Sequence, residues 1–134
     1  MVKLSEEMVE AFSNAKVVPL ATASKDGVPN VAPMGTVYLK DPETVWILDN
    51  FMQKTAANVA ETKKAALYLY GEGIKGCCQI KGDAVIETSG EAYDEAKKIF
   101  HAKNPNLPAK GLLVISVTDV YNCMPGPEAG KKLL

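Results

Sequence analysis

Apolar residues recur with the period of an α-helix in three parts of the chain. Met8, Ala11 and Phe12 follow the spacing i, i+3, i+4 and predict a first helix, which Ser5 can cap. A second helix is predicted over residues 56–63. A third helix follows further along, with an apolar stripe formed by Tyr93, Ala96, Ile99 and Phe100.

The remaining apolar runs are rich in β-branched and aromatic residues, as strands are. They cover residues 17–23, 30–40, 44–48, 65–70, 75–87 and 111–120. Asp26 and Gly27 separate the first two runs, and an Asp-Gly pair tolerates the positive φ of a tight hairpin. Pro19 suggests that the first strand lies at an edge or carries a bulge.

The order of these elements is helix, three strands, helix, two strands, helix, strand. Hairpin turns and few helices favour a small antiparallel barrel over a parallel sheet with alternating helices. We therefore predict a mostly β fold with peripheral helices and a six-stranded antiparallel barrel. The 134 residues fit a single domain, 1–134, in which residues 125–134 form a C-terminal tail.

Charge argues against a nucleic-acid partner. The formal net charge is -1, and the lysines are spread along the chain rather than clustered. The sequence contains no arginine, so any bound anion must be held by lysine, which acts as a point charge rather than as a two-pronged donor.

The cysteines and the histidine suggest neither a disulfide framework nor a metal site. The cysteine count of three is odd, and Cys77 and Cys78 are adjacent, so we expect no disulfide. A single histidine, His101, without spaced cysteine pairs makes zinc binding an unfavoured interpretation. The start lacks the apolar segment of a signal peptide, and no apolar run could span a bilayer. We expect a reduced, cytoplasmic protein without a membrane partner.

The pair Lys54-Thr55 lies between a predicted strand and a predicted helix. Free N–H groups at a helix start carry partial positive charge, and Lys54 and the Thr55 hydroxyl would add a full charge and a donor. Such a site suits a phosphate group. The same pair also suits a plain helix start, with Thr55 as cap and Lys54 as a solvated charge, and alone it favours that interpretation.

Three segments together resemble the FMN-binding split-barrel family related to pyridoxamine 5'-phosphate oxidase, and in particular its small FMN-binding flavoproteins. The segments are the strand 20–23 with its Asp-Gly hairpin, the Lys54–Val59 segment and residues 79–84. The Lys54–Val59 segment is the most specific, and the resemblance extends over nearly the whole chain.

The resemblance implies a split β-barrel, a homodimer, and FMN held in the groove between the two subunits. It places the FMN phosphate on Lys54 and Thr55. It places the flavin ring more loosely against Met34, Gly35, Thr36, Leu48, Asp49 and Asn50.

A glutamine on the fifth strand often contacts the cofactor in this family, which implies Gln79 here or, with a register shifted by one pair, Cys77. The alternation of the strand supports Gln79 independently. Cys78, Ile80 and Gly82 suit a barrel interior, and the residues between them suit a polar or interfacial face.

The chain also departs from the oxidases of this family. Those enzymes hold pyridoxal phosphate with arginines and a C-terminal histidine, whereas this chain has no arginine and its His101 falls in the third helix. Pyridoxamine-phosphate oxidase activity is therefore not expected.

Three functional hypotheses remain. The first is an FMN flavoprotein that acts in electron transfer or as a small oxidoreductase, with an unidentified redox partner or substrate and with no side chain assigned as catalytic. The second is a flavin- or deazaflavin-dependent reductase with a specific organic substrate. The third is a split-barrel binding protein without a cofactor.

Overall fold

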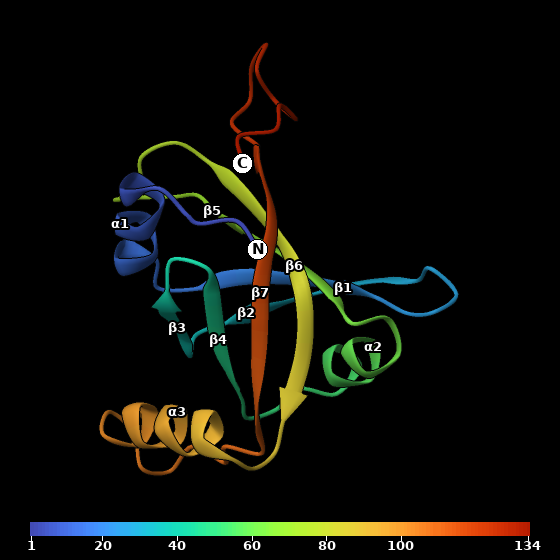
Figure 1. The fold of residues 1–134 in the computed structure, drawn as a ribbon, viewed down its shortest axis with the longest axis vertical. Helices are drawn as coiled ribbons and strands as arrows, with labels where there is room; N and C mark the ends of the chain where they lie inside the picture. Colours follow the sequence, from blue (N-terminus) through green and yellow to red (C-terminus); the bar gives the residue numbers. More distant parts are fainter.

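In the computed structural model, which describes residues 1–134, one antiparallel sheet curls around an apolar core (Figure 1). Its seven strands have the spatial order β2-β1-β5-β6-β7-β4-β3. They are β1 (Val18–Ala23), β2 (Pro29–Met34), β3 (Val37–Asp41), β4 (Thr44–Asp49), β5 (Lys64–Leu69), β6 (Cys78–Glu87) and β7 (Gly111–Asn122). The predicted antiparallel, mostly β architecture is confirmed.

The number of strands differs from the prediction because the expected strand 30–40 is two strands. It breaks at Gly35 and Thr36, and its halves, β2 and β3, form the two opposite edges of the sheet. Exposed and partly buried residues alternate without interruption from Pro29 to Thr36, so the pattern along the chain does not indicate that the strand ends at Met34. Pro19 was expected to mark an edge strand or a bulge. The strand that contains it, β1, is not an edge strand, because it lies inside the sheet next to the edge strand β2.

The three helices are α1 (Glu6–Asn14), α2 (Lys54–Thr62) and α3 (Glu91–His101). The Ser5 hydroxyl accepts a hydrogen bond from the Met8 N–H at 3.3 Å, so the predicted cap of the first helix is confirmed. Helix α2 packs on β1 and β6, and α3 packs on β4 and β7. The helices thus lie outside the curl of the sheet (Figure 1).

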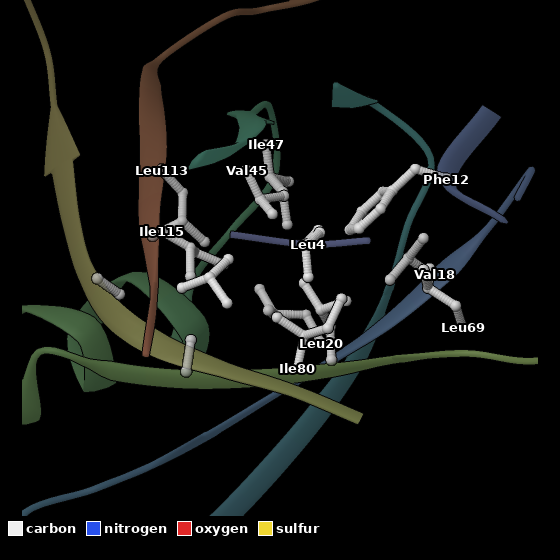
Figure 2. Close-up of a cluster of buried hydrophobic side chains, with 14 of the residues drawn as sticks. Leu4, Phe12, Val18, Leu20, Val45, Ile47, Leu69, Ile80, Leu113 and Ile115 are labelled. Carbon is white, nitrogen blue, oxygen red and sulfur yellow. The ribbon is translucent and has the colours of Figure 1, made fainter. Parts of the chain in front are cut away.

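The inside of the curl is filled by aliphatic side chains from every part of the sheet (Figure 2). Alternate residues of each strand point inward, as Leu20, Ile80 and Ile115 do. The core also includes Leu4, Phe12, Val18, Val45, Ile47, Leu69 and Leu113. Burial of these side chains is the main source of stability for a domain of this size.

Strands β6 and β7 approach closely at Gly82. A Cβ atom there would overlap the carbonyl oxygen of Ser116 and the side chain of Ile115. The pairing register also shifts between Lys81 and Gly82, which is the mark of a β-bulge at this glycine. The glycine therefore allows β6 to bend around the core.

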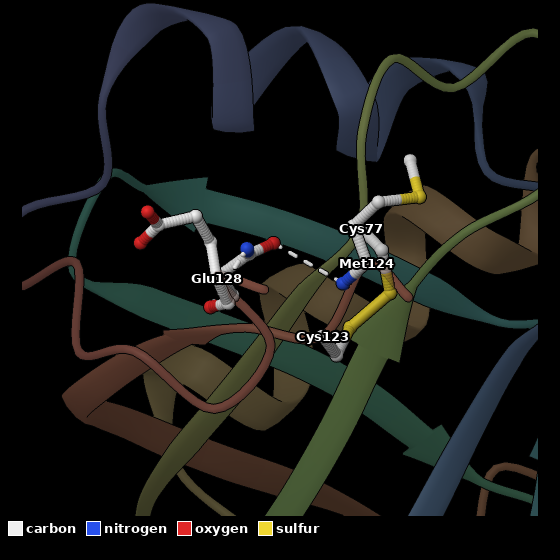
Figure 3. Close-up of a disulfide and its surroundings, with 5 residues drawn as sticks. Cys77, Cys123, Met124 and Glu128 are labelled. Carbon is white, nitrogen blue, oxygen red and sulfur yellow. Dashed lines mark hydrogen bonds between the residues drawn. A yellow bond between two sulfur atoms is a disulfide. The ribbon is translucent and has the colours of Figure 1, made fainter. Parts of the chain in front are cut away.

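The expectation of no disulfide is wrong, because Cys77 and Cys123 form one (Figure 3). The pairing of Cys78 with Asn122 brings these two cysteines opposite each other, although they are separated by 46 residues along the chain. Counting cysteines could not reveal this, since the odd cysteine is Cys78, which is buried with a free thiol. Burial raises the pKa of the Cys78 thiol and keeps it protonated.

The C-terminal tail folds back onto the end of β7. The backbone of Lys132 pairs with that of Tyr121 in an isolated antiparallel β-bridge, and the Lys132 ammonium forms an ion pair of 3.2 Å with Asp119. Hydrogen bonds from the Thr118 hydroxyl, which has the larger effect, and from the Lys132 ammonium lower the pKa of the Asp119 carboxyl group. No helix of the protein is long and apolar enough to cross a membrane.

We expect replacement of both Cys77 and Cys123 by serine to lower the free energy of unfolding by about 2–4 kcal/mol, since the bridge closes a long loop in the unfolded chain. Urea denaturation without reductant measures the difference. A reductant should lower the stability of the wild type to that of the double variant and leave the variant unchanged. Equal stability of the two oxidised proteins would contradict this role.

Candidate functional site

A groove of about 510 Å³ lies between the edge strand β2 and the start of α2. We call it the α2 groove. Its lining residues are Asn30, Val31, Ala32, Pro33, Met34, Gly35, Thr36, Leu48, Asn50, Phe51, Met52, Gln53, Lys54 and Thr55. The volume falls in the range of sites for small molecules and cofactors.

The N-terminus of α2 at this groove has no side-chain cap. Gln53 occupies the cap position without capping, and the N–H groups of Lys54, Thr55 and Ala56 have no hydrogen-bond partner within the chain. These donors form the positive end of the helix dipole. They provide what an anionic group needs at a helix start.

Thr55 adds a hydroxyl donor at the same place. Its side chain is 3% exposed, and its oxygen accepts a hydrogen bond of 3.2 Å from the Asn30 amide. Because Asn30 occupies the oxygen as an acceptor, the hydroxyl proton remains available for donation. The amide from β2 therefore orients Thr55 rather than competing with it.

Charge in the α2 groove has one sign. Lys54 is the only charged residue among those that line it, and Lys54 forms no ion pair within the chain. A lysine in the first turn is unfavourable for an isolated helix, because it faces the positive end of the dipole. An anion bound at the groove would remove that conflict.

The other part of the α2 groove is apolar, with polar groups in fixed positions. Met34, Leu48 and Met52 supply apolar surface. The Thr36 hydroxyl donates to the Leu48 carbonyl at 3.1 Å, and the Asn50 amide lies 3.4 Å from the Thr36 oxygen. This combination suits a flat ring with polar edges.

Asp49 does not line the groove, although the sequence placed it there. Strand alternation turns Leu48 and Asn50 toward the groove, and Asp49 points away. Its buried carboxylate accepts a hydrogen bond of 3.0 Å from the Met52 N–H and lies 3.9 Å from the Lys110 ammonium. Lys110 also donates to the Met52 carbonyl at 3.1 Å, so the pair shapes the loop that forms the groove floor.

Gln79 and Cys77 also lie outside the α2 groove. Gln79 pairs with Tyr68 on one side and Tyr121 on the other, on the outer face of the sheet. The alternation predicted for β6 is confirmed, because Cys78 and Ile80 are buried. Cys77 is held in the disulfide. Neither side chain lines the groove.

The structure adds lining residues that the sequence did not indicate. Asn30 and Gln53 bring amides to the groove, and Phe51, at its rim, is 76% exposed. The one signal in the sequence is the position of Phe51, an aromatic residue three positions before Lys54. Asn30 could not be found because its partner, Thr55, lies 25 residues away.

The other candidate groups have structural roles. Trp46 packs with Ala96 and Leu112 beneath α3. His101 lies at the end of α3, with Nε2 2.9 Å from the Leu107 carbonyl oxygen. Asn58 is buried and donates to the Thr22 hydroxyl at 3.1 Å.

Comparisons with known proteins agree with this fold. The family model described as pyridoxamine 5'-phosphate oxidase matches residues 4–124. An uncharacterized protein of Methanocaldococcus jannaschii, MJ0282, is 44% identical over 137 aligned positions, which cover 98% of this chain and 88% of that protein.

Two solved structures share the architecture. HupZ of Group A Streptococcus has a TM-score of 0.81 and 26% identity, and the match covers 97% of this chain and 100% of that one. An FMN-binding protein of Syntrophomonas wolfei has a TM-score of 0.70 and 21% identity, with coverage of 87% and 83%. The predicted split-barrel fold is confirmed.

We expect Asp49→Ala to lower the free energy of unfolding by about 1–3 kcal/mol without any added ligand, because it leaves the Met52 N–H unsatisfied and Lys110 without its carboxylate. Urea denaturation measures this loss. Asp26→Ala, in an exposed turn, is the control and should be nearly neutral. A neutral Asp49→Ala would remove Asp49 from the support of the loop.

Proposed function

The chain belongs to the pyridoxamine 5'-phosphate oxidase family, and on that premise we propose that it is a flavoprotein that binds FMN in the α2 groove. One observation carries the proposal. The uncapped start of α2 and Lys54 face a groove without a carboxylate, which suits a phosphate joined to an uncharged ring.

The residues of the groove divide into two groups in this proposal. Lys54, Thr55 and the free N–H groups of α2 would bind the phosphate. Thr36 and Asn50 would contact polar edges of the ring, and apolar residues such as Met34 would cover its faces. FMN, when bound, supplies the electron-transfer chemistry, and the protein binds and orients it. We assign no side chain as a general acid or base.

The proposal is electron transfer or a small oxidoreductase rather than oxidation of pyridoxamine phosphate. A second phosphate-bearing ligand would need its own cations, and Lys54 is the only charged residue that lines the groove. His101 is not among the lining residues and is engaged with Leu107. The chain also has no arginine to replace those of the oxidases.

We further propose that the protein is a homodimer in which a second copy covers the α2 groove. The outer face of the sheet carries Tyr68 at 43% exposure and Val31 at 67% exposure. Val31 also lines the groove, so the exposed apolar face is continuous with it. Gln79 lies on the same face, beside Tyr68, where it could reach a groove of the other copy.

Addition of FMN to the protein should quench the FMN fluorescence and shift its visible band. Lys54→Ala should weaken binding by about 1–3 kcal/mol, the loss of one charge-assisted hydrogen bond. Lys16→Ala, which removes an exposed lysine outside the groove, is the matched control and should bind as the wild type does. Equal affinity of Lys54→Ala and the wild type would remove Lys54 from the site.

Two further ligands separate the alternatives in the same titration. A deazaflavin that binds more tightly than FMN would favour the deazaflavin-dependent reductase. Riboflavin has the ring of FMN without its phosphate, so its binding should not depend on Lys54 if Lys54 binds the phosphate. A protein that leaves the fluorescence of FMN unchanged would favour the cofactor-free binding protein.

Light scattering on the purified protein should give the mass of a dimer, and Tyr68→Asp should shift it toward a monomer of 14.4 kDa. A charge placed at an apolar interface core disfavours association. FMN affinity should fall in the same variant, because the second copy covers the groove. Leu133→Asp, in the C-terminal tail, is the control. If only Leu133→Asp dissociates the dimer, the interface lies at the tail instead.

A further inference from the structure

A second groove, of about 600 Å³, runs along the strand β3 at the sheet edge. We call it the β3 groove. It lies between α1 and the end of α3, which stand on either side of β3 in Figure 1. Gly35 and Thr36 line both this groove and the α2 groove. The two grooves therefore meet at the link between the edge strands.

The surface of the β3 groove is largely apolar. Its aliphatic and aromatic residues come from α1, β3, α3 and the loop after α3, and they include Val9, Phe12, Val37, Leu39, Phe100 and Leu107. Val9, Val37, Leu39 and Leu107 are only partly buried, so the groove leaves part of their apolar surface uncovered. A volume of this size matches that of small-molecule sites.

The β3 groove carries one charged residue, Lys103, and no carboxylate. Lys103 is exposed and forms no ion pair. The neighbouring polar side chains are engaged locally, since Ser13 donates to the Glu10 carbonyl and Asn104 accepts from the Asn106 N–H. Lys103 is therefore the one group in the groove that could pair with a negative charge on a ligand.

We propose that the β3 groove binds the substrate of the flavoprotein, and that this substrate is a small apolar organic monoanion with its charge on Lys103. The apolar body lies on β3 between α1 and α3, next to the Gly35–Thr36 link and hence next to the flavin. The substrate role depends on the proposed function. The binding itself depends only on this chain.

Decanoate and decanol are the probes, since they share an apolar chain and differ in charge. In the full chain labelled with ¹⁵N, decanoate should shift the backbone amide signals of Val37 and Leu39. Lys103→Gln should weaken the binding of decanoate by about threefold, which is the effect of losing one exposed ion pair. The same substitution should leave the binding of decanol unchanged. Lys98→Gln, which changes an exposed lysine of α3 outside the groove, is the control. Leu39→Trp fills the groove and should reduce binding of both probes.

Equal decanoate affinity of Lys103→Gln and the wild type would overturn the proposal, as would signal changes confined to residues outside the groove. Loss of all binding because a second copy covers β3, detected as a dimer that Leu39→Asp dissociates, would overturn it as well.

The same samples separate this proposal from the proposed function. With FMN bound, decanoate should also shift the visible flavin band. If the protein binds both FMN and decanoate and the band does not shift, the β3 groove is not the substrate site. Binding of decanoate without binding of FMN would refute the flavoprotein and leave an apolar anion site. Binding of FMN without decanoate would refute the β3 site alone.

Discussion

The link Gly35–Thr36 is the constraint on which the shape of the molecule depends. It joins β2 and β3, which are neighbours in the chain but occupy the two opposite edges of the sheet. Three residue steps from Met34 to Val37 span about 11 Å at most, at about 3.6 Å per residue. The sheet must therefore curl until its edges nearly meet. The bulge at Gly82 gives β6 the bend that this curl requires. The α2 groove and the β3 groove are the spaces left on the two sides of the link.

Helices α1 and α2 begin differently, and the start of α2 is the less stable of the two. Helix α1 begins with a Ser5 cap and with Glu6 and Glu7 in its first turn, all of which stabilise a helix start. Helix α2 begins without a cap and with Lys54, which the dipole disfavours. A sequence that follows the helix rules at one start and breaks them at another points to a use for the second. Its position in a groove without carboxylates is the reason for our proposal that it binds an anion.

Much of the fold could be predicted, because the spacing of apolar residues along the chain indicates most of its strands and helices. The strand ranges and the Ser5 cap depend on neighbours within a few residues. The break at Gly35 could not be predicted, since the alternation of side chains passes through it and only the closure of the sheet requires it. The Cys77–Cys123 disulfide depends on the β6–β7 register, which no count of cysteines contains.

The candidate site divides in the same way. The Lys54-Thr55 pair is a local signal, and both residues line the α2 groove. The resemblance placed Asp49 at the ring with its neighbours Leu48 and Asn50, but the Asp49 side chain turns away from the groove toward the Met52 N–H and Lys110. Asn30 and Lys110 act through partners far along the chain, Thr55 and Met52, and only the folded structure pairs them.

The absence of arginine gives the site its particular character. A guanidinium would bind a phosphate through two parallel bonds, and this chain has instead one lysine and the free N–H groups at the start of α2. Backbone donors are fixed by the helix and need no side-chain ordering when a ligand binds. Asn30 and Asn50 likewise hold Thr55 and Thr36 before any ligand is present. If the groove binds the proposed ligand, preorganised geometry contributes to its affinity beside the charge of Lys54, and the loop held by Asp49 and Lys110 is part of that geometry.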